Sequence, residues 1–268
     1  MEKSRVKFIL QFKKLFLLGS IGYIFITVLK INMLQVDTKD IMYLFVDVFG
    51  NINIDSNNFI IEYSMYLYNF IFILQITSNY IYKDFDRESI YIFTRTANKN
   101  KWINYKFIEM IEILLIYYGI QFVLVFVLGI MNGFMVVNIK NLIIILLITI
   151  INMILSIIIL SLFCNLIAFK LGELVSYGLG VFGVSISLIT VCIFRIFNIN
   201  ENMYKFIPFI SSITSWYGDL NGIINRNIYF FKFFLLNSNL FINIIIQVFI
   251  IILIKKIMKI VVSKIDIL

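Results

Sequence analysis

Six long apolar stretches constrain this chain more than any other feature, because each is long enough to cross a membrane as a helix. A transmembrane helix needs about 20 predominantly apolar residues. In lipid, the backbone polar groups of such a segment must bond within the protein, which favours helices. The sequence therefore predicts an all-α membrane protein that forms one transmembrane domain. The predicted spans are residues 15–34, 59–80, 107–130, 141–163, 174–197 and 237–254.

Composition excludes several classes of function. Of the 268 residues, 61% are hydrophobic and 14% are charged, which leaves little room for a separate catalytic domain. The chain contains no histidine, so Ser-His-Asp triads and zinc protease motifs are excluded. Cys164 and Cys192 lie in apolar segments without C-x-x-C spacing and predict neither a disulfide nor a metal site. A phosphate-binding G-x-x-x-x-G-K-[ST] motif is also missing. We therefore predict that this chain by itself is not an enzyme and binds no cofactor.

The basic residues predict the orientation in the membrane. Most of the 23 Lys and Arg residues fall inside the cell if both termini are cytoplasmic, as the positive-inside rule requires. The net charge of +8 then needs only membrane lipid, and no nucleic acid, as a partner. Residues 1–14 predict an amphipathic interfacial helix, because polar and apolar side chains take opposite faces. The first outer loop is the most acidic segment, with Asp37, Asp40, Asp47 and Asp55.

The predicted cytoplasmic loop at 81–106 is the most informative segment. A cluster of charges from Lys83 to Glu88 precedes apolar residues that a solvated loop would not need, among them Ile90, Phe93 and Trp102. Such side chains need a surface against which to be buried. They predict docking onto a partner or onto lipid headgroups.

This loop resembles a known family. The run Asp86-Arg87-Glu88-Ser89, followed by Thr94, Thr96, Asn98-Lys99, Trp102 and Lys106, is similar to the loop after the second span of ABC-2-type permeases, the six-helix membrane subunits of ATP-driven exporters. The family's usual glycine after the acidic-Arg-acidic run is replaced here by Ser89. The layout is similar too, with an amphipathic N-terminal helix and a long outer segment at 198–236. In the family that segment holds short re-entrant helices, which we expect around Pro208.

The resemblance implies a function and partners. The loop would carry a coupling helix that sits in a groove of a separate ATPase subunit, which binds ATP and Mg. A second permease chain, identical or related, would complete the transporter in a bacterial cytoplasmic membrane. Its cargo would be amphipathic peptides, bacteriocins, toxins or other lipophilic molecules. The resemblance gives the ATPase-coupling role to Asp84, Asp86, Arg87, Glu88 and Phe93, with a second contact at Lys170 and Glu173.

Other intramembrane polar residues have structural and functional interpretations. Asn69 and Gln75 lie deep in the second span and predict a cavity lining. Glu109 and Glu112 share one face of the third span; they could relay protons, although pairing with Lys106 is the favoured interpretation. A stripe of small residues on the fifth span predicts a helix-packing or dimer face. The stripe consists of Ser176, Gly180, Gly183, Ser187 and Thr190.

Two other classes of function stay open. A stand-alone ion-coupled carrier or channel would need charges and broken helices deep in the membrane, and neither is evident from the sequence. An intramembrane enzyme would need several convergent reactive groups, of which only Glu109 and Glu112 form a pair. We therefore expect an exporter permease, with the carrier or channel as the alternative.

Overall fold

A computed structural model describes residues 2–34, 39–52, 59–86, 99–197, 212–220, 223–224 and 239–265. For residues 2–12, 195 and 196 it describes the backbone alone. Throughout these ranges the regular structure is helical, and an isolated β-bridge joins Asp40 to Met135.

The expectation of an all-α protein with six candidate spans is confirmed. Six helices are long and apolar enough to cross a membrane. Two of them, α5 (Lys99–Met131) and α6 (Ile139–Leu171), have 33 residues each, or about 50 Å, so they exceed a hydrocarbon core of about 30 Å. The other spans are Lys13–Met33 of α1, Phe59–Asp86, Glu173–Phe194 of α7 and Leu240–Lys264, which forms α8.

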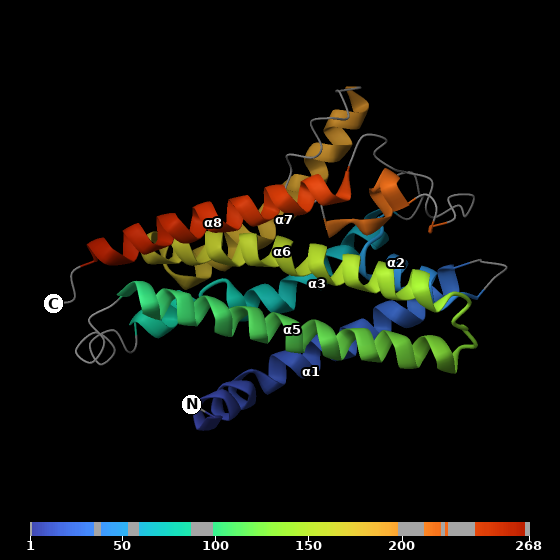
Figure 1. The fold of residues 1–268 in the computed structure, drawn as a ribbon, viewed down its shortest axis with the longest axis horizontal. Helices are drawn as coiled ribbons and strands as arrows, with labels where there is room; N and C mark the ends of the chain where they lie inside the picture. Colours follow the sequence, from blue (N-terminus) through green and yellow to red (C-terminus); the bar gives the residue numbers. More distant parts are fainter. Residues whose placement is uncertain are drawn as a thin grey trace.

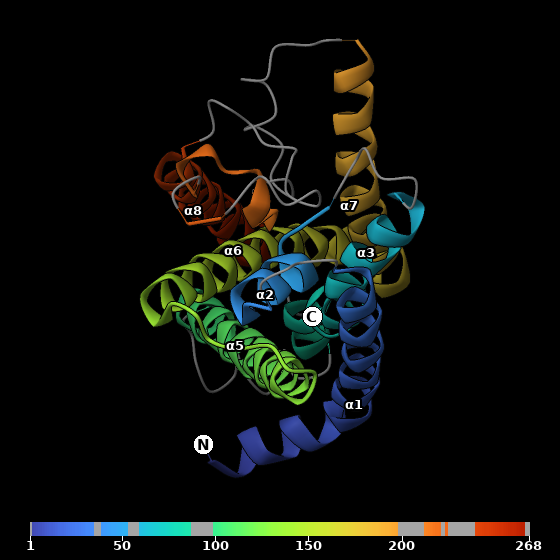
Figure 2. The same ribbon diagram turned by 90° about the vertical axis from the view of Figure 1, so that its right-hand side faces the viewer.

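The two ends of the helix bundle differ in what they contain. Both chain termini lie at one end, which we call the terminal end, together with the turn between α6 and α7 (Figure 1). The turn between α5 and α6 lies at the opposite end, which we call the α2 end after the short helix α2 (Ile41–Phe49). Helix α7 (Glu173–Ile196) runs obliquely, and its last turns stand clear of the other helices in both views (Figures 1 and 2).

Residues 2–14 of the predicted interfacial helix and the first span form one helix. Helix α1 is continuous from Glu2 to Met33, and Figure 2 shows its first turns at an angle to the rest. The residues before Gly19 include neither glycine nor proline, so nothing in the sequence ends a helix between the expected interfacial segment and the span.

Helix α2 overturns the expectation of a simple outer loop between the first two spans. All nine of its residues are buried, and it packs against α1, α3 (Phe59–Thr77), α5 and α6. The Asp40 carboxylate accepts a hydrogen bond from the Met42 N–H at 3.0 Å and caps the helix start. Every residue of α2 except Asp47 is apolar or aromatic, which explains why the segment enters the bundle. The acidic residues of this region are typical of a loop, so the sequence did not indicate that its apolar run forms a buried helix.

The second span is broken rather than continuous. Helix α3 ends at Thr77, a turn covers 78–79, and residues 80–86 resume the helix. Asn165 of α6 stabilises the break: its side-chain oxygen accepts from the N–H groups of Ile81 and Tyr82 at 2.8 and 3.2 Å, and its amide donates to the Thr77 carbonyl at 2.7 Å. These are backbone groups that a break leaves without helical bonds.

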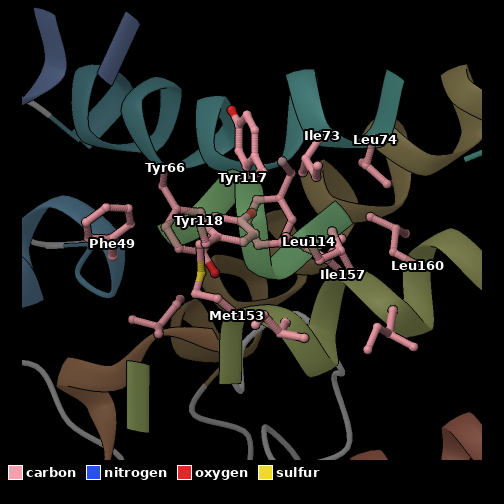
Figure 3. Packing of buried hydrophobic residues seen from close by; sticks show 14 of the residues in the cluster. Phe49, Tyr66, Ile73, Leu74, Leu114, Tyr117, Tyr118, Met153, Ile157 and Leu160 are labelled. Carbon is pink, nitrogen blue, oxygen red and sulfur yellow. The ribbon is translucent and has the colours of Figure 1, made fainter. Parts of the chain in front are cut away.

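The core joins α2 to the long helices. Figure 3 shows side chains from α2, α3, α5 and α6 in one cluster, and all of them are buried. Phe49 of α2 stacks on Phe122 of α5 with ring centroids 4.2 Å apart. The cluster thus anchors α2 by aromatic contacts as well as by burial.

The expected re-entrant region between the fifth and sixth spans is described over 212–220. It forms two short 3-10 helices, Thr214–Trp216 and Gly218–Leu220. Residues 212–217 are buried at the α2 end. Pro208 lies outside the described residues.

Candidate functional site

Four of the predicted coupling residues lie at the terminal end, and no described contact joins them directly to one another. Asp84 and Asp86 lie in the helical segment 80–86, and Lys170 and Glu173 flank the turn between α6 and α7. Gly172 makes this turn possible, because its φ of +82° is one that other residues rarely adopt. Arg87, Glu88 and Phe93 lie outside the described residues.

Two adjacent side chains connect segment 80–86 to different helices. The Lys83 ammonium lies 2.8 Å from a carboxylate oxygen of Glu173, the first residue of α7. The next residue, Asp84, lies 3.0 Å from the ammonium of Lys106 in α5. We call this arrangement the ion-pair bracket; it consists of Lys83, Glu173, Asp84 and Lys106. It connects the end of the second span to α5 and α7 together.

Lys106 extends the bracket into α5. Its ammonium also lies 2.7 Å from Glu109, and the Tyr80 hydroxyl donates to the same carboxylate oxygen at 2.7 Å. The favoured interpretation of Glu109, pairing with Lys106, is confirmed. Glu112, its neighbour on the helix, is half-buried. The Lys106 ammonium and the Tyr80 hydroxyl thus hold one oxygen of the Glu109 carboxylate in place.

An aromatic cluster fills the space behind the bracket. Phe85 contacts the rings of Trp102 and Phe169, with centroids 6.0 and 5.4 Å apart, and Tyr82 meets Phe169 edge to face. The expectation that Trp102 docks onto a partner or lipid headgroup is therefore wrong, since it is buried inside this chain. A pattern of single apolar residues cannot show whether the covering surface is internal or external.

The terminal end also presents exposed charges of both signs. Asp86 and Lys170 are exposed, and the side chains of Lys83 and Glu173 are 37% and 40% accessible. In water such an ion pair contributes little stability, so Lys83 and Glu173 can exchange partners at low cost. This surface is polar and lies over the aromatic cluster around Phe85.

The stripe of small residues on α7 packs within the chain over part of its length. A Cβ at Gly180 would lie 2.6 Å from the Cys164 sulfur of α6, and one at Gly183 would lie 4.0 Å from Leu160. Ser176 and Ser187 are buried, whereas Thr190 is half-buried. The glycines therefore allow α7 to approach α6, and the sequence could not distinguish this contact from a dimer face.

The two residues expected to line a cavity, Asn69 and Gln75, lie in different surroundings. Asn69 is fully buried, and its amide donates to the Val48 carbonyl of α2 at 3.3 Å. Gln75 is exposed on the outside of the bundle. The structure thus gives Asn69 a role in holding α2 and separates it from Gln75.

A second polar cluster lies at the α2 end and was missed by the sequence analysis. The Lys30 ammonium lies 3.1 Å from an Asp47 carboxylate oxygen, and the side chains are 3% and 0% accessible. The Asn51 amide donates to the same oxygen at 2.8 Å, and the Ser215 hydroxyl donates to the Asn51 side-chain oxygen at 2.8 Å. In the sequence this pair is visible as one basic residue, Lys30, in one apolar run and one acidic residue, Asp47, in another.

Residues 212–217 cover this cluster. The Trp216 indole donates to the Ile52 carbonyl at 3.1 Å, and the Ser215 N–H donates to the Gly50 carbonyl at 2.9 Å. The Asn243 amide of α8 donates to the Tyr217 hydroxyl at 3.3 Å. Burial raises the pKa of Tyr217, so its hydroxyl stays protonated. Residues 212–217 therefore connect α2 to α8.

No family model, no curated protein and no solved structure matches this chain.

Proposed function

We propose that this chain is the membrane subunit of an ATP-driven exporter, with ATP and Mg bound by a separate ATPase. The observation that carries the proposal is the ion-pair bracket. An ATPase that docks on segment 80–86 and on the turn between α6 and α7 would contact two elements that are already connected by Lys83 and Glu173. Movement of one docking surface would then reach α5 and α7 at the same time.

The break in the second span supports this mechanism. Because a turn at 78–79 separates α3 from segment 80–86, that segment can tilt without rotating the whole span. Energetic coupling between two sites requires an element with more than one arrangement, and a helix interrupted at a turn is such an element. Asn165 supplies hydrogen bonds to both sides of the break.

The partners follow from the proposed function. We expect a second permease chain, identical or related, since six helices from one chain would form half of the transport route. In the native membrane the terminal end would face the cytoplasm of a bacterial cell. An interior rich in aromatic side chains suits amphipathic peptides, toxins or other lipophilic cargo.

The experiment is affinity purification of the tagged chain from native membranes in mild detergent, with mass spectrometry of bound proteins. We expect a P-loop ATPase in stoichiometric amounts. The variant Asp86→Arg with Lys170→Glu reverses two exposed charges at the terminal end and should reduce the bound ATPase at least about tenfold. Lys140→Glu, an exposed reversal at the start of α6, is the matched control and should leave it unchanged. A chain that purifies without any ATPase would refute the proposal.

A stand-alone ion-coupled carrier is the second candidate, because the structure contains features that the sequence did not reveal. The pair of Lys30 and Asp47 is buried, and the second span is broken. Buried charges and interrupted helices occur at the ion sites of carriers. This candidate predicts that the purified chain alone moves protons or Na⁺ in proteoliposomes and that Asp47→Asn stops the flux. Loss of transport after Glu109→Gln with Glu112→Gln would instead locate the ion site at the terminal end.

A further inference from the structure

Helix α2 occupies the interior of the bundle at one end. With nine residues it is about 13 Å long, too short to cross a membrane. It packs against α1, α3, α5 and α6, and all of its residues are buried. Helix α2 thus fills the bundle interior at this end.

Two other connections described at this end, the turn between α5 and α6 and residues 212–217, are bound to α2 or to the residues that flank it. The Ile41 N–H donates to the Met135 carbonyl in the turn between α5 and α6, and the Met135 N–H donates to the Lys39 carbonyl. After the helix, Gly50 and Ile52 accept hydrogen bonds from Ser215 and Trp216. Within the described residues, the turn between α5 and α6 and residues 212–217 are therefore both held at α2.

The polar groups that hold α2 suggest more than a static packing role. A buried ion pair contributes less to stability than well-packed apolar side chains of the same volume, because both charges lose their hydration. The second carboxylate oxygen of Asp47 has no hydrogen-bond partner among the described residues. Apolar residues at positions 30 and 47 would hold the helix at least about as well, whereas a buried pair loosens its hold once one charge loses its partner.

From these contacts we propose that α2 is a plug helix: seated, it closes the α2 end, and in a second state it leaves its seat, with the Lys30–Asp47 pair acting as the latch. The seated state is the one described here. The plug applies to an ATP-driven exporter and to an ion-coupled carrier alike, and thus goes beyond either function. It needs no ligand for its test.

The test measures how fast a cysteine on α2 reacts with a water-soluble maleimide. Native Cys164 and Cys192 are replaced by alanine, and Val46→Cys, at a fully buried position, is the probe. The protein is placed in lipid nanodiscs, so that both ends meet water. Asn132→Cys, exposed in the turn between α5 and α6, is the accessible control and should react fast. With the latch intact, we expect the probe to react at least about a hundredfold more slowly than this control.

Latch variants distinguish an electrostatic latch from general damage. Lys30→Met leaves Asp47 buried without its cation and should raise the labelling rate of Val46→Cys at least about tenfold. Adding Asp47→Leu removes the lone charge and should return the rate to within about twofold of the latched protein. If Lys30→Met does not fold, Ser215→Ala, which removes the bond to Asn51, takes its place with a rise of about threefold.

A disulfide lock completes the test. A Cβ at Gly50 would lie 2.9 Å from the Cβ of Thr214, so Gly50→Cys with Thr214→Cys needs a shift of about 1 Å to form a disulfide. Oxidation of this pair in the Lys30→Met protein should return labelling to the slow rate, and reduction should restore it. The proposal is overturned if the latched probe reacts as fast as Asn132→Cys, or if Lys30→Met leaves the rate unchanged. It is also overturned if the double variant stays as fast as the single one, or if the lock fails to slow labelling.

Discussion

The two ends of this bundle use ion pairs in opposite ways. At the α2 end, the side chains of Lys30 and Asp47 are 3% and 0% accessible. At the terminal end, Lys83 and Glu173 are 37% and 40% accessible. The distances are similar, at 3.1 and 2.8 Å, so burial makes the difference. A pair without water is costly to break from one side, whereas a pair in water can form and separate.

This difference fits two roles in one molecule. The exposed pair connects surface elements that a partner could move, and the buried pair holds a helix in the interior. The pair of Lys106 and Asp84, with side chains 13% and 23% accessible, is intermediate between the two. The comparison therefore predicts that the effect of a substitution follows burial and not the number of charges.

The largest effect should come from the buried pair. Lys30→Met leaves a lone carboxylate inside the bundle and should lower the free energy of unfolding by about 3–5 kcal/mol, measured by chemical denaturation in mild detergent. Lys30→Met with Asp47→Leu should recover to within about 1 kcal/mol of the starting protein. A single variant that costs less than about 1 kcal/mol would remove the contrast between the two ends.

The next largest effect should come from Asn165, a buried neutral side chain at the terminal end. A substitution there separates the effect of burial from the effect of charge. Asn165→Leu leaves the N–H groups of Ile81 and Tyr82 without their acceptor and should cost about 3 kcal/mol of unfolding free energy. Asn132→Leu makes the same chemical change in an exposed turn and should cost under about 1 kcal/mol. Equal costs at the two sites would show that the break in the second span does not depend on Asn165.

Two glycines of α7 test burial without any polar group. Gly180→Ala places a methyl against the Cys164 sulfur and should cost about 1–3 kcal/mol, and Cys164→Ala in the same chain should recover part of the loss. Gly178→Ala has nothing within 4 Å of the new methyl and should stabilise the helix by about 0.5–1 kcal/mol. The readout is the same denaturation curve. Identical effects at both positions would contradict the packing of α7 on α6.

The smallest effect on stability should come from the exposed pair. Lys83→Met removes the cation beside Glu173 and should change the unfolding free energy by under about 1 kcal/mol. Its effect should appear in function, as a lower rate of ATP hydrolysis by the copurified complex. A large loss of stability with normal hydrolysis would reverse the roles given to the two ends.

The spans were predictable from the sequence because crossing lipid sets a length and a polarity that a chain shows locally. Helix α2 was not predictable: its run from Ile41 to Phe49 is too short for a span, and its neighbouring aspartates are typical of a loop. The break at Ser78 was hidden because its stabilising partner, Asn165, lies far away in the sequence. Both depend on contacts between distant segments.

The contacts of the candidate site also divide into those that local spacing predicts and those that depend on distant segments. Residue types indicated that Glu109 pairs with Lys106, since the two lie three residues apart on one helix. The pairing of Lys83 with Glu173 depends on how the second span meets the turn before α7, and local spacing carries no information on that. Trp102 shows the same limit, because an apolar residue near a loop is compatible with an internal or an external cover.

Photocrosslinking in native membranes can show whether an ATPase binds the terminal end and not the α2 end. A photoreactive amino acid is placed at Asp86, at Lys170 or at Asn132; all three are exposed, the first two at the terminal end and the third at the α2 end. We expect the photoreactive residue at position 86 or 170 to form a covalent adduct with a P-loop ATPase, and the one at position 132 to form none. Adducts from Asn132 alone, or no ATPase adduct from either residue of the terminal end, would contradict it.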